Sequence, residues 1–229
     1  MVGTTCGNVS CDTPPTPLIL LASPFEGPMT VPPLTPRRRA ILDAATQVLD
    51  DQGLRGLTHR SVDRAAGLPE GTTSAYFRTR RALQLALAEY VAARMADDVD
   101  VLVDQLAGCT PEDPQAVELV IGLLGRWLDE RTLVLARVEL TLEAARDPEL
   151  AAMLRQTRDR VLRVVAQVLD GHGLDQSAAR AESLMASFDG ILLSALLKPD
   201  GERQDYLSRS LDRAINNVGH DPVHPLGVE

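Results

Sequence analysis

Apolar residues recur every three or four positions along most of the chain, which is the spacing of a helix with one buried face. The first such segment begins near Pro36 and ends at Gly53, because proline suits a first helical turn and glycine suits the residue after the last one. Two shorter helices follow, one over residues 58–66 that Thr58 caps, and one from residue 69 or 70 through about residue 77. The apolar face of the first helix carries Ile41, Ala44, Ala45, Val48 and Leu49.

The rest of the chain repeats the helical pattern, and prolines or glycines separate its segments. β-branched and aromatic residues, the latter only 3% of the chain, do not cluster as strands require. The sequence therefore predicts an all-α fold in which a three-helix head precedes a larger helical domain. The further helices are predicted over residues 81–106, 114–129, 131–145, 148–170, 176–197 and 202–217.

Both ends of the chain lack this pattern. Residues 1–36 contain eight prolines and no basic residue, and proline at that density blocks helices and strand ladders. We expect a disordered, proline-rich arm over residues 1–36 and an irregular tail over residues 219–229. The head then occupies residues 37–83, and the larger helical domain occupies residues 84–218.

The net charge of −9 argues against a nucleic-acid partner until it is divided along the chain. Residues 37–94 hold ten Arg and six Asp or Glu, a balance of +4. Residues 95–229 hold 13 basic and 24 acidic residues, a balance of −11. A basic segment attached to an acidic body is typical of a small DNA-binding head. The positive excess of residues 37–94 is modest, so charge alone does not distinguish a DNA-binding head from ordinary variation in composition.

The second and third predicted helices are joined by Ala66-Gly67-Leu68-Pro69, a short turn in which Gly67 can take a positive φ angle. Two short helices joined in this way have the geometry of a helix-turn-helix, whose second helix enters the major groove of DNA. Small side chains over residues 71–75 let that helix approach DNA closely. Four arginines around it are candidate phosphate ligands: Arg60, Arg78, Arg80 and Arg81.

At these residues the chain resembles the TetR (tetracycline-repressor-like) family. The resemblance is strong over residues 37–90 and runs there without a gap, whereas beyond residue 90 it is mostly architectural. The matching positions are Arg39 to Ala45, Gly53, Leu57, Thr58, Val62, Ala65 to Leu68, Gly71, Thr72, Tyr76, Phe77, Ala82 and Leu83.

The resemblance implies a homodimer with a three-helix DNA-binding head and a helical body that binds a small-molecule ligand. Carried over residue by residue, Thr58 caps the second helix and binds a phosphate, and Phe77 belongs to the core. Arg80 stands where the family usually has a phosphate-binding lysine. The residues predicted to bind double-stranded DNA are Thr58, Arg60, Pro69, Glu70, Thr72, Thr73, Ser74, Tyr76 and Arg80.

Ser74 departs from the family pattern, which usually has a phosphate-binding tyrosine three residues before the phenylalanine. Its hydroxyl still donates a hydrogen bond, with a shorter reach. Glu70 is also unusual, because a carboxylate repels phosphates unless it accepts from a cytosine amino group. The other interpretation of Glu70 is a favourable charge at a helix N-terminus. These two residues keep an alternative open, a helical adaptor or architectural binding protein with a degenerate DNA-binding head.

The body is expected to hold the ligand and the partner subunit. We predict a ligand pocket that includes Trp127, Arg137, Val138, Leu142 and Phe188, with a core tryptophan and ion pairs within one helix as the alternatives. The helices over 176–197 and 202–217 are predicted to form a four-helix bundle with a second copy, the alternative being an intramolecular core. The predicted dimer interface consists of Leu184, Phe188, Ile191, Leu192, Ala195, Leu207 and Leu211.

Other chemistry is not indicated. No catalytic motif appears and the four histidines lack metal-ligand spacing, so we expect no enzyme, no metal and no cofactor apart from an unidentified small-molecule effector. Cys6, Cys11 and Cys109 are expected to be free thiols in a reducing cytosol. No apolar run approaches the roughly 20 residues of a membrane-spanning helix. The sequence predicts a cytoplasmic transcriptional regulator, most simply a repressor that an effector releases from a palindromic operator.

Overall fold

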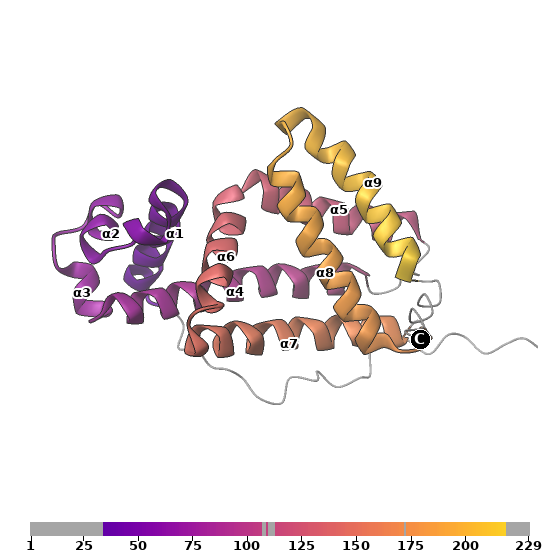
Figure 1. Cartoon of the computed structure of the whole chain (residues 1–229), viewed down its shortest axis with the longest axis horizontal. Coiled ribbons are helices and arrows are strands. Elements are labelled where there is room, and N and C mark those ends of the chain that lie inside the picture. Colours follow the sequence, from indigo (N-terminus) through magenta and orange to yellow (C-terminus); the bar gives the residue numbers. More distant parts are fainter. Residues whose placement is uncertain (1–33, 107–108, 110–112, 172, 219–229) are drawn as a thin grey trace, which may run out of the picture. The chain divides into compact units, whose positions relative to one another are not determined.

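The computed structural model describes residues 34–106, 109, 113–171 and 173–218, and within these ranges the chain forms helices and no strand. The three helices of the head are α1 (Pro36–Gly56), α2 (His59–Ala65) and α3 (Thr72–Tyr76) (Figure 1). The body contains α4 (Arg80–Leu106), α5 (Pro114–Asp129), α6 (Arg131–Ala144), α7 (Pro148–Gly171), α8 (Ser177–Leu196) and α9 (Asp200–Val218). The predicted all-α fold is confirmed. The predicted tail and most of the predicted arm, residues 1–33, lie outside the described residues.

The helices begin where the sequence supplies caps. Thr35 precedes α1, and its hydroxyl accepts a hydrogen bond from the Arg38 amide at 3.3 Å. Asp113 precedes α5, and its carboxylate accepts from the Gln115 amide at 2.9 Å. A proline follows each cap directly, where its missing N–H costs no helical hydrogen bond. These starts agree with the positions that proline predicts.

Within the head, two helix boundaries differ from the sequence prediction by more than one residue. Gly53 interrupts α1 with φ 65° and ψ −179°, but helical turns resume and continue to Gly56. The third helix begins at Thr72 rather than at residue 69 or 70. Its start is delayed because the Pro69 carbonyl accepts from the Thr72 amide at 3.2 Å and closes a turn first.

One hydrophobic core runs from the head into the body. In the head, α1 contributes Ile41 and Leu49, α2 contributes Val62, and Phe77 follows α3, all 3% exposed or less. The helix α4 starts beside α3 and extends into the body, where it packs against α5, α6 and α7 (Figure 1). The helix α1 also packs against α6, so the head is joined to the body by two helices of the body, α4 and α6.

Candidate functional sites in the head and the body

The turn between α2 and α3 has the geometry of a helix-turn-helix. Thr58 and Ser61 form a reciprocal cap at the start of α2, with amide-to-hydroxyl distances of 3.1 and 2.9 Å. Gly67 has φ 64°, as the turn requires. At the other end of the motif, the His59 ring donates from Nε2 to the Phe77 carbonyl at 2.6 Å. The predicted cap at Thr58 and the predicted positive φ at Gly67 are therefore present.

A buried carboxylate holds α3 in place. Asp63 on α2 is 1% exposed, and its two oxygens accept from the Thr73 amide at 2.7 Å, the Thr73 hydroxyl at 2.6 Å and the Gly71 amide at 2.8 Å. Burial alone raises the pKa of Asp63, but these hydrogen bonds and the nearby His59 outweigh it, so the pKa lies below its ordinary value. Asp63 stays ionised and fixes the orientation of α3 relative to α2.

This arrangement corrects one predicted DNA contact. Thr73 is fully buried against Asp63 and does not face solvent. Sequence reasoning missed Asp63, although its position was a signal. It lies four residues after His59 and three before Ala66, on the buried face of α2, where a carboxylate needs hydrogen-bond partners.

The remaining predicted DNA-binding residues lie on the outside of the head. Tyr76 is 42% exposed, Thr72 is half-buried, and the others are exposed. Arg60 and Glu70 form an ion pair at 3.0 Å with both side chains about three-quarters exposed, so the charge of Glu70 is partly neutralised. The Ser74 hydroxyl donates to the Gly71 carbonyl at 2.8 Å, which leaves its oxygen lone pairs as acceptors. Their contacts with DNA stay predictions.

Two of the candidate phosphate-binding arginines contact protein groups at the junction of head and body. Arg81 forms ion pairs with Asp147 at 2.6 Å and Glu149 at 2.7 Å. It therefore ties α4 to the start of α7. The Arg80 guanidinium donates to the Leu54 carbonyl at 2.6 Å while remaining exposed.

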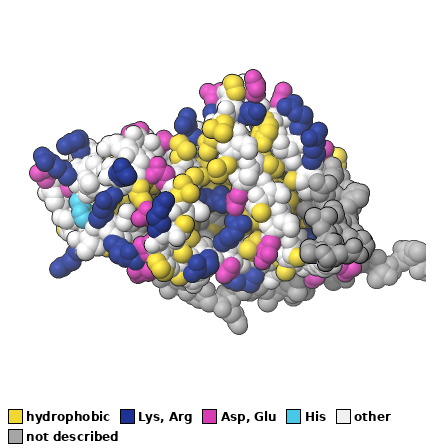
Figure 2. Space-filling view, in the orientation of Figure 1, with side chains coloured by type: hydrophobic (Ala, Val, Ile, Leu, Met, Phe, Trp, Pro, Cys, Tyr) yellow, Lys and Arg dark blue, Asp and Glu magenta, His cyan; other side chains and the backbone are white. Residues whose placement is uncertain are grey.

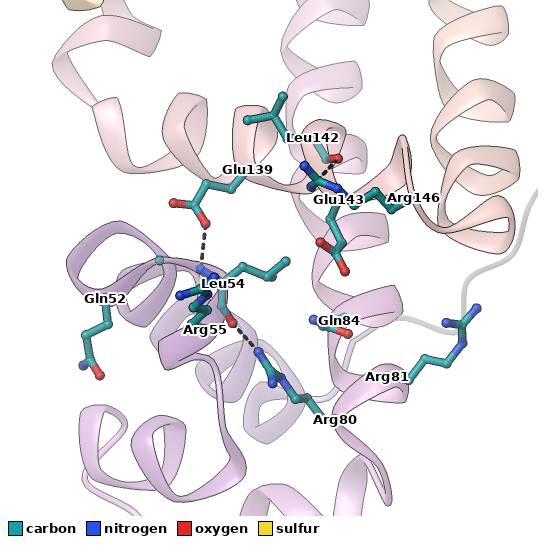
Figure 3. Close-up of a pocket in the computed structure, with 11 residues that line it drawn as sticks. Gln52, Leu54, Arg55, Arg80, Arg81, Gln84, Glu139, Leu142, Glu143 and Arg146 are labelled. Atoms are coloured by element: carbon teal, nitrogen blue, oxygen red, sulfur yellow. Dashed lines mark hydrogen bonds between the residues drawn. The ribbon is translucent and has the colours of Figure 1, made fainter.

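A polar cavity of about 780 Å³ lies at this junction (Figure 3). The Leu54 amide in α1 donates to the carboxylate of Glu139 in α6 at 2.6 Å, so the same peptide segment is held by Arg80 and by Glu139. Leu142, predicted in the ligand pocket, lines this junction cavity instead and is 61% exposed. The cavity is lined by Gln52, Gly53, Leu54, Arg55, Arg80, Arg81, Gln84, Glu139, Leu142, Glu143 and Arg146.

A second cavity of about 810 Å³ lies inside the body, between α4, α5, α6, α7 and α8. Its volume falls in the range of small-molecule sites, and its wall is mainly apolar. Of the predicted pocket residues, Trp127, Arg137 and Phe188 line it, whereas Val138 and Leu142 do not. Both lie on other sides of α6, whose residues Leu140 and Ala144 face the cavity. The Trp127 indole N–H donates to Asp98 at 2.7 Å.

Charged side chains form one part of the wall of this apolar cavity. Asp189 on α8 forms ion pairs with Arg137 on α6 and, at 2.8 Å, with Arg158 on α7. The partner of Arg137 therefore lies on another helix, whereas the alternative that the sequence left open was an ion pair within one helix around Glu139, Glu143 and Arg146. Figure 2 shows the molecule hollowed between α6 and α8, with hydrophobic side chains at the rim and basic and acidic side chains between them.

The predicted dimer interface is largely buried within one chain. Ala195 on α8 and Leu207 and Leu211 on α9 are 0% exposed, and α9 packs against both α5 and α8. The intramolecular alternative therefore holds for these residues, because the apolar side of α9 is used to cover α5. The large hydrophobic side chains that remain exposed on α8, or directly after it, are Leu193, at 48%, and Leu197, at 88%.

Comparison with known proteins agrees with this geometry. Residues 41–87 match the model of the bacterial regulatory proteins of the tetR family, and residues 111–217 match a tetracyclin repressor-like C-terminal domain. A solved member of the TetR family from Streptomyces coelicolor A3 is 30% identical, with a TM-score of 0.61 over 79% of this chain and 98% of that one. The chain belongs to the TetR family. It is a helix-turn-helix transcriptional regulator whose DNA-binding head is followed by a C-terminal helical domain.

Two other proteins similar to this chain are a curated regulator and a solved binding protein. The regulator BetI of Rhizobium meliloti is 25% identical over 71% of this chain and 79% of its own length. The structure of the multidrug binding protein EbrR complexed with proflavin is 31% identical, with a TM-score of 0.51 over 78% of this chain and 99% of that one. Matches to curated relatives span 54 to 80% of those proteins' own length. The curated relatives are named as transcriptional regulators rather than as enzymes.

Among the described helices, none is both long and apolar enough to cross a membrane.

Proposed function

We propose that this TetR-family regulator is a homodimeric repressor that leaves a palindromic operator when a small molecule fills the 810 Å³ cavity. The observation that carries the proposal is the position of α6 between the two cavities. Arg137, Leu140 and Thr141 line the inner cavity, whereas Glu139 and Glu143 on the other side of the same helix line the junction with the head. A ligand that shifts α6 therefore acts directly on the contact that holds α1.

Release from DNA follows from geometry. The two heads of a dimer must reach successive major grooves roughly 34–36 Å apart. A ligand changes this equilibrium only by its difference in affinity for the two conformers. A small displacement of α6 moves the head of each subunit, and the spacing no longer fits the operator. A regulator of this kind works in the cytoplasm, where the chromosome is accessible.

We place the partner subunit on the exposed side of α8 beside α9. Leu193 and Leu197 are large apolar side chains left in solvent there, Leu193 within the last turns of α8 and Leu197 directly after its end. A second copy that covers them with its own Leu193 and Leu197 gives a two-fold interface.

Mobility-shift assays with the intergenic DNA upstream of the gene test the proposal. Binding should weaken steeply with salt, because phosphate contacts release counterions. Tyr76→Ala and Thr72→Ala should each lower operator affinity by about tenfold, the worth of a good base or methyl contact. Arg209→Ala, which removes an exposed arginine of α9, is the control and should leave affinity unchanged.

The alternative, an adaptor with a degenerate head, predicts a different outcome. DNA binding would then be absent or insensitive to salt, and Tyr76→Ala would behave like the control. The Arg60–Glu70 ion pair would explain such a result, because it engages Arg60, one of the candidate phosphate ligands.

A further inference from the structure

The wall of the inner cavity has an uneven charge. Its lining includes the four arginines Arg137, Arg146, Arg155 and Arg158, but only one carboxylate, that of Asp189. The remaining lining residues are mainly aliphatic or aromatic, among them Val91, Met95, Leu123, Trp127 and Phe188. The cavity therefore combines an apolar interior with an excess of positive charge at one part of its wall.

The two arginines that pair with Asp189 have further N–H donors that can bind a ligand. Within the described residues, Arg137 and Arg158 each give one N–H group to Asp189. A guanidinium has five N–H donors, and it binds a carboxylate through two of them in the strongest geometry. The three side chains are only 28 to 38% exposed, so a charge brought into this place is screened less than at the surface.

We propose that the effector of this cavity is an apolar molecule that ends in a carboxylate, and that Arg137 and Arg158 bind this carboxylate beside or in place of Asp189. The inference rests on the proposed function, in which the cavity receives the effector. The apolar part of the molecule occupies the space around Trp127 and Phe188. A cationic ligand would be repelled by the four arginines, and the one carboxylate of the wall, that of Asp189, already pairs with Arg137 and Arg158.

This binding mode also explains how the signal starts. Arg137 lies two residues before Glu139 on α6, and Asp189 ties it to α8. A ligand carboxylate that competes with Asp189 for Arg137 loosens the link between α6 and α8. The same helix then moves at Glu139, where it holds the head.

The test compares three probes with the same chain and different end groups: dodecanoate, dodecanol and dodecylamine, each below its critical micelle concentration. Binding to the full-length protein is followed by the fluorescence of Trp127, the only tryptophan of the sequence and part of the cavity wall. We expect dodecanoate to bind about tenfold or more tightly than dodecanol, because a hydrogen bond between charged groups is stronger than one to a neutral hydroxyl. Dodecylamine should bind more weakly than dodecanol.

Variants assign the preference to these residues. A variant that lacks only the two arginines would leave the Asp189 carboxylate unpaired. The test therefore uses a triple variant in which all three side chains are neutral: Arg137→Gln, Arg158→Gln, Asp189→Asn. It should bind dodecanoate and dodecanol within about twofold of each other and keep the dodecanol affinity of the parent. Asp189→Asn alone should bind dodecanoate more tightly than the parent does, because the competing carboxylate is gone. Arg163→Gln, on the exposed side of α7, is the matched control.

The outcomes separate the two proposals. Equal affinity for dodecanoate and dodecanol, or tighter binding of dodecylamine, overturns the carboxylate inference and leaves the effector role of the cavity intact. Tight, selective binding of dodecanoate that leaves operator affinity unchanged supports the carboxylate site and contradicts the proposed effector function. Failure of all three probes to bind overturns both.

Discussion

The amide of Leu54 in the head donates a hydrogen bond to the carboxylate of Glu139 in the body, at 2.6 Å and across 85 positions of the sequence. The Leu54 carbonyl meanwhile accepts from Arg80, the first residue of α4. One peptide segment of the head is thus held by both helices that join it to the body. Because α6 also lines the inner cavity, the Glu139 contact links one wall of the cavity directly to the head.

Loss of this contact should uncouple the two domains. We expect Glu139→Ala to bind dodecanoate like the parent, while the effector-induced loss of operator affinity shrinks from the 5–150-fold that is typical of allosteric coupling to about twofold or less. Glu139→Gln keeps an oxygen that accepts from Leu54 and serves as the control, with most of the response retained. Mobility shifts with and without dodecanoate measure the response. An unchanged response in Glu139→Ala would show that coupling runs through α4 alone.

This contact also marks the limit of what the sequence predicts. The head was predictable because its signals are local: a cap at Thr58, a glycine at position 67 and an apolar face on each helix lie within a few residues of one another. The partners of Glu139 and Arg137 lie on other helices far away in the sequence. The pattern of one helix does not indicate which neighbour its polar side faces.

The sequence also assigned Ala195, Leu207 and Leu211 to the wrong surface, for a related reason. The helix α8 is apolar over more than one side, and the sequence does not tell which side covers the chain's own core. The structure places Leu207 and Leu211 against that core, together with α5. Burial within the subunit and burial between subunits require the same residue types, so composition does not distinguish them.

Gly53, which lies beside Glu139, should not tolerate substitution by a residue with a side chain. Its φ of 65° and ψ of −179° fall in a region that only glycine occupies readily, and a Cβ there would lie 3.2 Å from the Glu139 carboxylate. We expect Gly53→Ala to destabilise the fold by about 1–3 kcal/mol. Gly122, an exposed helical glycine of α5 with open space around it, is the control, and Gly122→Ala should stabilise by about 0.5–1 kcal/mol. Urea unfolding measures both, and equal effects would contradict the strained backbone at Gly53.

Asp63 should make the head sensitive to acid. Its folded-state pKa is lowered, so the stability it contributes is present above the unfolded pKa of about 3.9 and is lost as the pH falls through the folded value. We expect Asp63→Asn to lower the free energy of unfolding at pH 7 by about 1–3 kcal/mol, because three donors lose a charged acceptor. The difference from the parent should shrink below about pH 4.

Urea unfolding at pH 7 and at pH 3.5 tests this dependence on Asp63. Asp51→Asn is the matched control, since Asp51 is an exposed carboxylate of the same head. A difference between parent and Asp63→Asn that stays constant down to pH 3.5 would mean that the variant acts through packing rather than charge. Thr73→Val, which removes one of the donors to Asp63, should cost about 1 kcal/mol at pH 7 and leave the outer surface of α3 unchanged.

The exposed side of α8 should decide whether the protein is a dimer. Leu197 is 88% exposed and Leu193 is 48% exposed, although both are large apolar side chains next to a well-packed helix pair. The double variant Leu193→Arg, Leu197→Arg should sediment as a monomer at micromolar concentration, because four arginines would meet across a two-fold axis without partners. It should also lose most of its operator affinity while keeping dodecanoate binding. Val101→Arg, at a 52% exposed residue of α4, is the control and should remain a dimer. A double variant that still sediments as a dimer would place the interface on another surface.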